Sequence, residues 1–343
     1  MMLKWLRRGA AALVLAFVAA GFWSASHWNE LQTKYAARRL QSATTNEDRA
    51  RWADALVSRG DVGIDQLLEL LRSAEPPVRS AAAAALDRHL NALAANDPDG
   101  AEIGGQLLEL FIAGDDSTRE ALASLLPTIP TRCEAANHAK CKEAASLALK
   151  MTSAPARLAA IRCAANPRLG LRSEIVPLLN AAEADVRRAA LFAVGPATDA
   201  EAVIGDEELF HWLHDPDSGV RLMCREVLVS RGRNDVEIGL GRRLAAPEAA
   251  ERLQLLLDLR YDDDVADPEP WLERLSHDAD PGVRAGSVRV VVELATQRNL
   301  PMPVWVAKLA EADPDATVRR IASFYRLPPE THPDAALRQV GAP

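Results

Sequence analysis

Short segments with leucines at helical spacing recur along the chain, and each is followed by a turn and a second apolar segment. Examples of the first kind are "GIDQLLELLRS", "IGGQLLELFIA", "DEELFHWLH" and "PVWVAKLAE". Apolar residues at i, i+3 and i+4 fall on one face of an α-helix. The pattern therefore predicts units of helix, tight turn and helix along most of the chain.

The turns share a pattern that is centred on an arginine. Eight arginines, called repeat arginines here, stand near the start of the second segments, and successive ones are 30–40 residues apart. They are Arg79, Arg119, Arg157, Arg187, Arg221, Arg252, Arg284 and Arg319. This spacing is typical of helical-hairpin repeat proteins. The chain is thus predicted to be an all-α solenoid of about eight hairpins.

An acidic residue stands four residues before seven of the eight repeat arginines. We expect its carboxylate to accept hydrogen bonds from the first N–H groups of the second helix. The arginine is expected to pair with that carboxylate or with its counterpart in the next repeat. Three residues after the arginine, six of the eight positions are small, which favours close helix packing. The selected turn residues are Asp115, Arg119, Glu183, Arg187, Asp217, Arg221, Asp280, Arg284, Asp315 and Arg319.

Two of the turns, "HDPDSGVR" and "HDADPGVR", have the composition of a metal site. A calcium-binding EF-hand loop needs glycine at its sixth position and glutamate at its twelfth, and neither copy fits. We therefore interpret both as structural turns, in which Asp217 and Arg221 belong to the repeat and His214 and Asp215 are incidental. His211 and His214 lack a third zinc ligand nearby in sequence, so we expect neither a metal nor another cofactor.

These units and their D-x-x-V-R turns resemble HEAT repeats, including the short HEAT-like repeats of phycobilin lyases. The resemblance covers residues 62–327 and implies a right-handed α-solenoid. It implies little about function, because such arrays serve as scaffolds, adaptors and occasionally enzymes. The iron-binding His-Glu motifs of the HEAT-repeat enzyme deoxyhypusine hydroxylase do not occur here, and no catalytic motif is recognisable. We expect no enzyme and no small-molecule substrate; a HEAT-like lyase or enzyme subunit is the alternative.

The N-terminus begins with basic residues and continues with an uncharged run of 18 residues, 9–26. Such a run is just long enough for a membrane anchor. We expect residues 1–26 to form an uncleaved transmembrane anchor helix with a cytoplasmic N-terminus. The repeats then lie outside the cytoplasm, in the periplasm if the source is bacterial. The alternative is a signal peptide whose cleavage releases a secreted protein.

Three regions are expected to follow this segment. Residues 27–60 form an N-terminal capping hairpin, residues 61–327 the HEAT-like repeats, and residues 328–343 a flexible proline-rich tail. Two cysteines, Cys133 and Cys141, lie close together in sequence, and an exported protein can join them by a disulfide. The alternative is two buried free thiols.

The net charge of −8 disfavours nucleic acid as a partner. Residues one, four or five positions after the repeat arginines are expected to face outward together. They include a stripe of Arg162, Arg188, Arg225, Arg289 and Arg320, interrupted by Leu253, Leu256 and Leu257. We therefore expect a scaffold whose concave face binds a protein partner, and we expect the bound surface of that partner to be acidic. The alternative is a solvated charged face with some salt bridges.

Overall fold

The computed structural model describes residues 28–73, 75–94, 97–196, 203–261, 265 and 267–326, without the side chains of 73, 131–136 and 326. These residues form helices joined by short turns, and none of them lies in a β-strand. The chain divides into two compact units, with the boundary between Val194 and Gly195. The all-helical class predicted from leucine spacing is confirmed.

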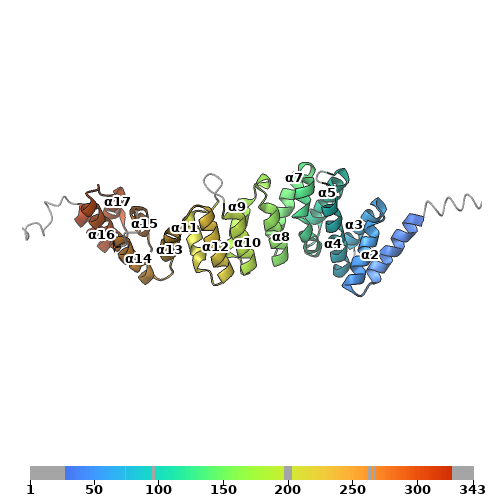
Figure 1. Ribbon diagram of the computed structural model, residues 1–343, viewed down its shortest axis with the longest axis horizontal. Helices are drawn as coiled ribbons and strands as arrows, with labels where there is room; N and C mark the ends of the chain where they lie inside the picture. Colours follow the sequence, from blue (N-terminus) through green and yellow to red (C-terminus); the bar gives the residue numbers. More distant parts are fainter. Residues whose placement is uncertain are drawn as a thin grey trace, which may run out of the picture. The chain divides into compact units, whose positions relative to one another are not determined.

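Within the described residues, eight pairs of sequential helices pack against each other, and we number them as repeats one to eight (Figure 1). The pairs are α3 (Asp61–Ser73) with α4 (Pro76–Ala92), α5 (Pro98–Ala113) with α6 (Asp116–Leu122), α7 (Thr128–Leu149) with α8 (Ala154–Ala164), α9 (Arg172–Ile175) with α10 (Ala184–Val194), α11 (Asp206–His211) with α12 (Ser218–Ser230), α13 (Asp235–Leu244) with α14 (Ala249–Tyr261), α15 (Glu269–Leu275) with α16 (Pro281–Arg298), and α17 (Val304–Ala312) with α18 (Ala316–Arg326). A further pair, residues 28–42 and α2 (Asn46–Val57), precedes repeat one.

Short 3-10 segments extend several of these helices. The segment η1 (Ala123–Leu125) extends α6, and η5 (Trp212–His214) extends α11. In repeat four the first helix consists of pieces, because η2 (Pro167–Leu169) and η3 (Val176–Asn180) flank the four-residue α9. Prolines 167 and 177 lack the N–H that a continuous helix needs, which explains the interruption.

Within each unit, most second helices pack against the second helix of the next repeat. The position three residues after each repeat arginine is buried in all eight repeats: Ala82, Leu122, Ala160, Ala190, Cys224, Leu255, Ser287 and Ala322. In the second unit, α14 packs on α16 and α16 on α18. The helices α12 and α14 do not share a comparable contact among the described residues.

The prediction of a single-pass membrane protein is corrected. Among the described residues, no helix combines the length and the apolar character needed to cross a membrane. The run 9–26, on which the prediction rested, lies outside the described residues, as does the predicted tail 328–343.

The segment that contains Cys133 and Cys141 lies within the helix α7. Eight residues of α-helix advance by about 12 Å, whereas the Cα atoms of a disulfide lie about 4.4–6.8 Å apart. Since the side chain of Cys133 lies outside the described residues, the disulfide stays a prediction, and it requires this helix to unwind. Cys141, Cys163 and Cys224 are buried.

Candidate partner-binding surface

Aspartates at the starts of the second helices cap them as predicted. Asp217 Oδ1 accepts a hydrogen bond from the N–H of Val220 at 3.0 Å. Asp280 and Asp315 each accept two such bonds at 2.7–3.1 Å, and Asp115 accepts one from Thr118 at 2.8 Å. These bonds satisfy N–H groups that have no partner within the helix.

Glutamates at the same position behave differently, so the predicted cap is wrong for them. Glu75 is the N-cap residue of α4 but its side chain makes no capping bond. Glu183 instead reaches the repeat arginine of the preceding repeat, with 2.8 Å between its Oε1 and Arg157 Nη2. This contact is the predicted pairing between neighbouring repeats, and here it uses the longer glutamate side chain.

Repeat arginines hold the turn that precedes their own helix. In five of them Nη1 donates to the carbonyl oxygens of the residues six and five positions earlier, at 2.6–3.0 Å: Arg187, Arg221, Arg252, Arg284 and Arg319. Arg119 makes the related contact with the carbonyls of Phe111 and Ile112. These carbonyls lie at or just after the end of the first helix, so one guanidinium edge joins the two helices of a hairpin.

The other guanidinium edge joins successive repeats in the second unit. Arg252 donates from Nε and Nη2 to the carboxylate of Asp278, at 2.6 and 3.0 Å. Arg284 donates in the same way to Asp313, at 2.8 and 2.9 Å. Asp278 and Asp313 stand six residues before the next repeat arginine, and we call this the bridging position. Paired N–H donors on a planar guanidinium match a carboxylate closely.

Residues at the bridging position were missed by the sequence analysis. Asp215 occupies it in repeat five, is buried, and accepts a hydrogen bond from the N–H of Asp217 at 2.9 Å. Asp278 and Asp313 accept the equivalent bond from Asp280 and Asp315 at 2.8 Å. Asp215 is therefore part of the turn rather than incidental. The repeated D-x-D pattern was visible in the sequence and is the signal that could have identified it.

Charged groups at the bridge influence one another. The hydrogen bond from Arg284 holds the pKa of Asp313 below its ordinary value, although burial acts in the opposite direction. The same bond raises the pKa of Arg284. The pKa of Arg252 is raised as well, chiefly by its hydrogen bond to Asp278. Arg284, Asp313 and Arg252 thus stay ionised near neutral pH.

The predicted arginine stripe is divided between the two units. All five residues are exposed on second helices, Arg162 and Arg188 in the first unit and Arg225, Arg289 and Arg320 in the second. Arg188 pairs with Asp185, and Arg225 with Asp235, at 2.6 and 2.9 Å. Such exposed pairs contribute about 0–1 kcal/mol.

Leucines predicted to interrupt the stripe have different surroundings. Leu253 and Leu257 are 40% and 46% exposed on α14. Leu256 is buried, and a Cβ atom added to Gly286 of α16 would lie 2.5 Å from its Cδ1. The prediction that Leu256 faces outward is therefore wrong, because this side chain fills the contact between α14 and α16.

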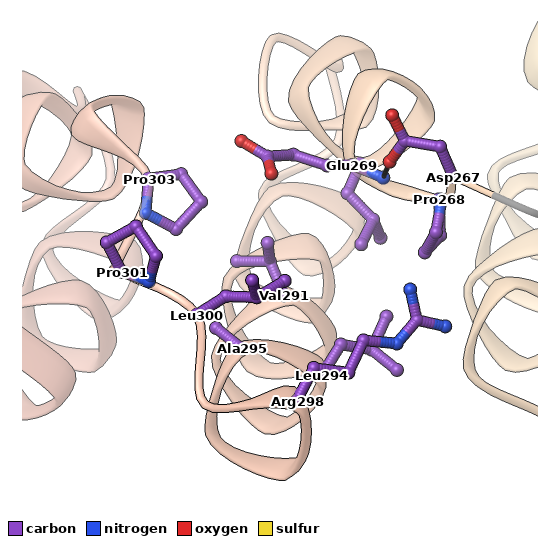
Figure 2. A pocket seen from close by; sticks show the side chains of 11 residues that line it. Asp267, Pro268, Glu269, Val291, Leu294, Ala295, Arg298, Leu300, Pro301 and Pro303 are labelled. Carbon is purple, nitrogen blue, oxygen red and sulfur yellow. Dashed lines mark hydrogen bonds between the residues drawn. The ribbon is translucent and has the colours of Figure 1, made fainter.

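Two cavities are unsuited to the predicted acidic partner, the first because of its size and the second because of its acidic lining. One lies between α15, α16 and the loop at Pro301 and Pro303, where the side chain of Arg298 extends along its edge (Figure 2). Its volume of about 40 Å³ holds a water molecule or two, far below the roughly 300–1,000 Å³ of typical ligand sites. The other, of about 240 Å³, is lined by acidic residues of α3 and α5.

A third cavity, of about 410 Å³, lies between α12 and α13 and is the largest of the three. Arg221, Arg225 and Arg242 line it together with Asp235 and several apolar side chains. His214, beside it, has its Nε2 2.7 Å from the carbonyl oxygen of Arg242. Among the described residues, no group of three or more potential metal ligands converges anywhere.

Comparisons with known proteins identify no family. No protein-family model matches the chain. No curated protein matches it. An engineered protein of known structure is 18% identical, with a TM-score of 0.43, over 90% of this chain and 91% of its own. The structure of YibA from Escherichia coli is 19% identical, with a TM-score of 0.39, over 83% and 97% of the two chains.

Proposed function

We propose that the chain is a HEAT-like repeat scaffold without catalytic activity, which binds a protein partner through the exposed side of its second helices. The repeat period and the D-x-x-V-R turns support the HEAT-like assignment. The capping aspartates and the arginines that close most of the hairpins support it further. The right-handed sense of the solenoid belongs to the same proposal.

One observation carries the proposal: a mixed apolar and basic face on three helices that pack in sequence, α14, α16 and α18. It comprises Leu253, Leu257, Arg289 and Arg320, all exposed one or five positions after a repeat arginine. No carboxylate among the described residues pairs with Arg289 or Arg320. Arginine is enriched at protein interfaces, and an unpaired guanidinium favours a partner with acidic groups.

Cross-linked capture in the native host tests the proposal. We expect the full-length chain to capture a specific partner, and the double variant Arg289→Gln and Arg320→Gln to lose most of it. Higher salt should weaken the capture, because exposed charges are screened. The matched control is Lys308→Gln, which removes an exposed positive charge from a first helix, α17. Equal capture by the double variant and the control would contradict the proposal.

A further inference from the structure

The junction between repeats five and six lacks the bridge that the next two junctions have. Arg221 Nη1 makes the usual two bonds, to the carbonyls of Asp215 and Pro216 at 2.7 and 3.0 Å. Its Nε and Nη2 have no acceptor among the described residues. The bridging position of repeat six is occupied by Ala246, which offers no carboxylate. One edge of the Arg221 guanidinium is therefore available.

The cavity of about 410 Å³ is lined in part by Arg221. It lies between α12 and α13. At this junction the second helices, α12 and α14, lack the close contact that joins the second helices of repeats six, seven and eight. The size of the cavity falls within the range of small-ligand sites, so it admits one or two side chains rather than a whole helix.

The lining of the cavity selects a carboxylate. Arg221, Arg225 and Arg242 contribute three guanidinium groups, and the one acidic residue of the lining, Asp235, pairs with Arg225 at 2.9 Å. Arg221 and Arg242 thus have no carboxylate partner among the described residues. Leu222, which is 59% exposed, adds apolar surface at the edge.

We propose that this cavity binds the carboxylate of an acidic residue in a partner protein, with apolar neighbours of that residue against Leu222 and Ile238. Arg221 Nε and Nη2 donate to the two carboxylate oxygens, as Arg252 and Arg284 donate to Asp278 and Asp313. Between repeats five and six, the ligand supplies the carboxylate that Asp278 and Asp313 supply at the following two junctions. That the ligand belongs to a protein rests on the proposed scaffold function.

Fluorescence anisotropy with the full-length chain and two labelled peptides tests this site. The probes are Gly-Leu-Asp-Leu-Gly and Gly-Leu-Asn-Leu-Gly, with blocked ends so that only the side chain differs in charge. We expect the aspartate peptide to bind at least about tenfold more tightly, because charge-assisted bidentate bonds are about twice as strong as neutral ones.

Two variants and one control identify the site. Arg221→Gln removes the donors, and Ala246→Asp places a carboxylate at the bridging position to compete for them. Each variant should bind the aspartate peptide at least about tenfold more weakly than the wild type does. Arg319→Gln removes an arginine with the same two carbonyl bonds but outside the cavity, so peptide binding should be unchanged. The melting temperature of each variant shows that it is folded.

Equal binding of the two peptides to the wild-type chain would overturn the proposal, as would unchanged aspartate-peptide binding in the folded Ala246→Asp variant. The scaffold function is tested separately, by the cross-linked capture of a partner in the native host. If capture depends on Arg289 and Arg320 but not on Arg221, the scaffold stands and this site falls. If peptide binding depends on Arg221 but nothing is captured, the site stands and the scaffold falls.

Discussion

Arg284 and Asp313 form a bidentate ion pair that is nearly enclosed between repeats seven and eight. The two residues are 29 positions apart in sequence, and Arg284 and Asp313 are only 8% and 4% exposed. Removing one charge leaves the other buried without its partner. Asp313→Asn should therefore lower the free energy of unfolding by about 3–5 kcal/mol, measured by urea denaturation.

The exposed pair of Arg88 and Asp54 provides the matched control. Its side chains are 52% and 55% exposed, with 2.6 Å between Nη2 and Oδ1. Asp54→Asn should cost less than about 1 kcal/mol, because solvent compensates both charges. Similar losses for the two substitutions would contradict the assigned role of the buried bridge.

The stabilising effect of Asp313 should depend on pH. Its pKa is held low in the folded chain by Arg284. Such a carboxyl contributes stability that is present above its unfolded pKa, near 3.9, and is lost as the pH falls through the folded pKa. The difference in melting temperature between the wild type and Asp313→Asn should thus be full at neutral pH and shrink below about pH 4. A difference that stays constant down to pH 2 would exclude this linkage.

Removing the cap of α12 should destabilise the second unit. Asp217→Ala deletes the acceptor for the N–H of Val220. It should lower the free energy of unfolding, measured by thermal denaturation, by about 1–2 kcal/mol. Glu75→Ala changes an N-cap residue whose side chain makes no capping bond, so its effect should be much smaller. An unchanged melting temperature for Asp217→Ala would contradict the capping role.

Two glycines of α13 should respond oppositely to alanine. A Cβ atom on Gly241 would lie 2.2 Å from the ring of Phe210, whereas on Gly239 it would meet nothing within 4 Å. Gly241→Ala should lower the free energy of unfolding by about 1–3 kcal/mol, because the added methyl group overpacks this contact. Gly239→Ala should raise the free energy of unfolding by up to about 1 kcal/mol, because alanine has the higher helix propensity. If both variants were equally stable in urea, the close packing of Phe210 on α13 would be wrong.

The buried thiols should be unreactive in the folded chain. Burial raises the pKa of Cys163 and of Cys224 to about 12, and the Cys224 thiol donates to the carbonyl of Leu209 at 3.0 Å. In a Cys133→Ser chain at pH 8, a thiol reagent such as DTNB should label the remaining cysteines only after denaturation, because the thiolate is the reacting species. Rapid labelling of the native chain would show that these sites open readily.

Features of the fold that depend on near neighbours were predicted from the sequence. The capping bond of Asp217 needs only the residues up to Val220, and leucine spacing fixes a helix face within two turns. By contrast, the bridge of Asp278 needs Arg252, 26 residues earlier. It also recurs at only some turns, so the period alone did not isolate it. Leu256 was misplaced because its side chain packs against Gly286 of the neighbouring α16, whereas Leu257, one residue further on, is exposed.

The candidate site was predicted only in part. Arg225 was selected from its repeat position, whereas Arg221 was assigned to structure alone. What makes Arg221 available is the alanine at position 246, and its effect becomes visible only when the bridges of the following repeats are known. The segment around Cys133 was considered only for its two cysteines, but it is rich in alanine, lysine and glutamate, which sustain the 22 residues of α7.

The missing bridge at Arg221 also has a mechanical consequence. Under tension applied along the second unit, the bonds of Arg252 to Asp278 and of Arg284 to Asp313 must break before repeats six, seven and eight separate. Between repeats five and six Arg221 makes no such buried bidentate bond, and the pair of Arg225 and Asp235 that joins these repeats is exposed. This junction should yield first under load, with the three repeats beyond it remaining together as one block, and an acidic ligand on Arg221 would strengthen it.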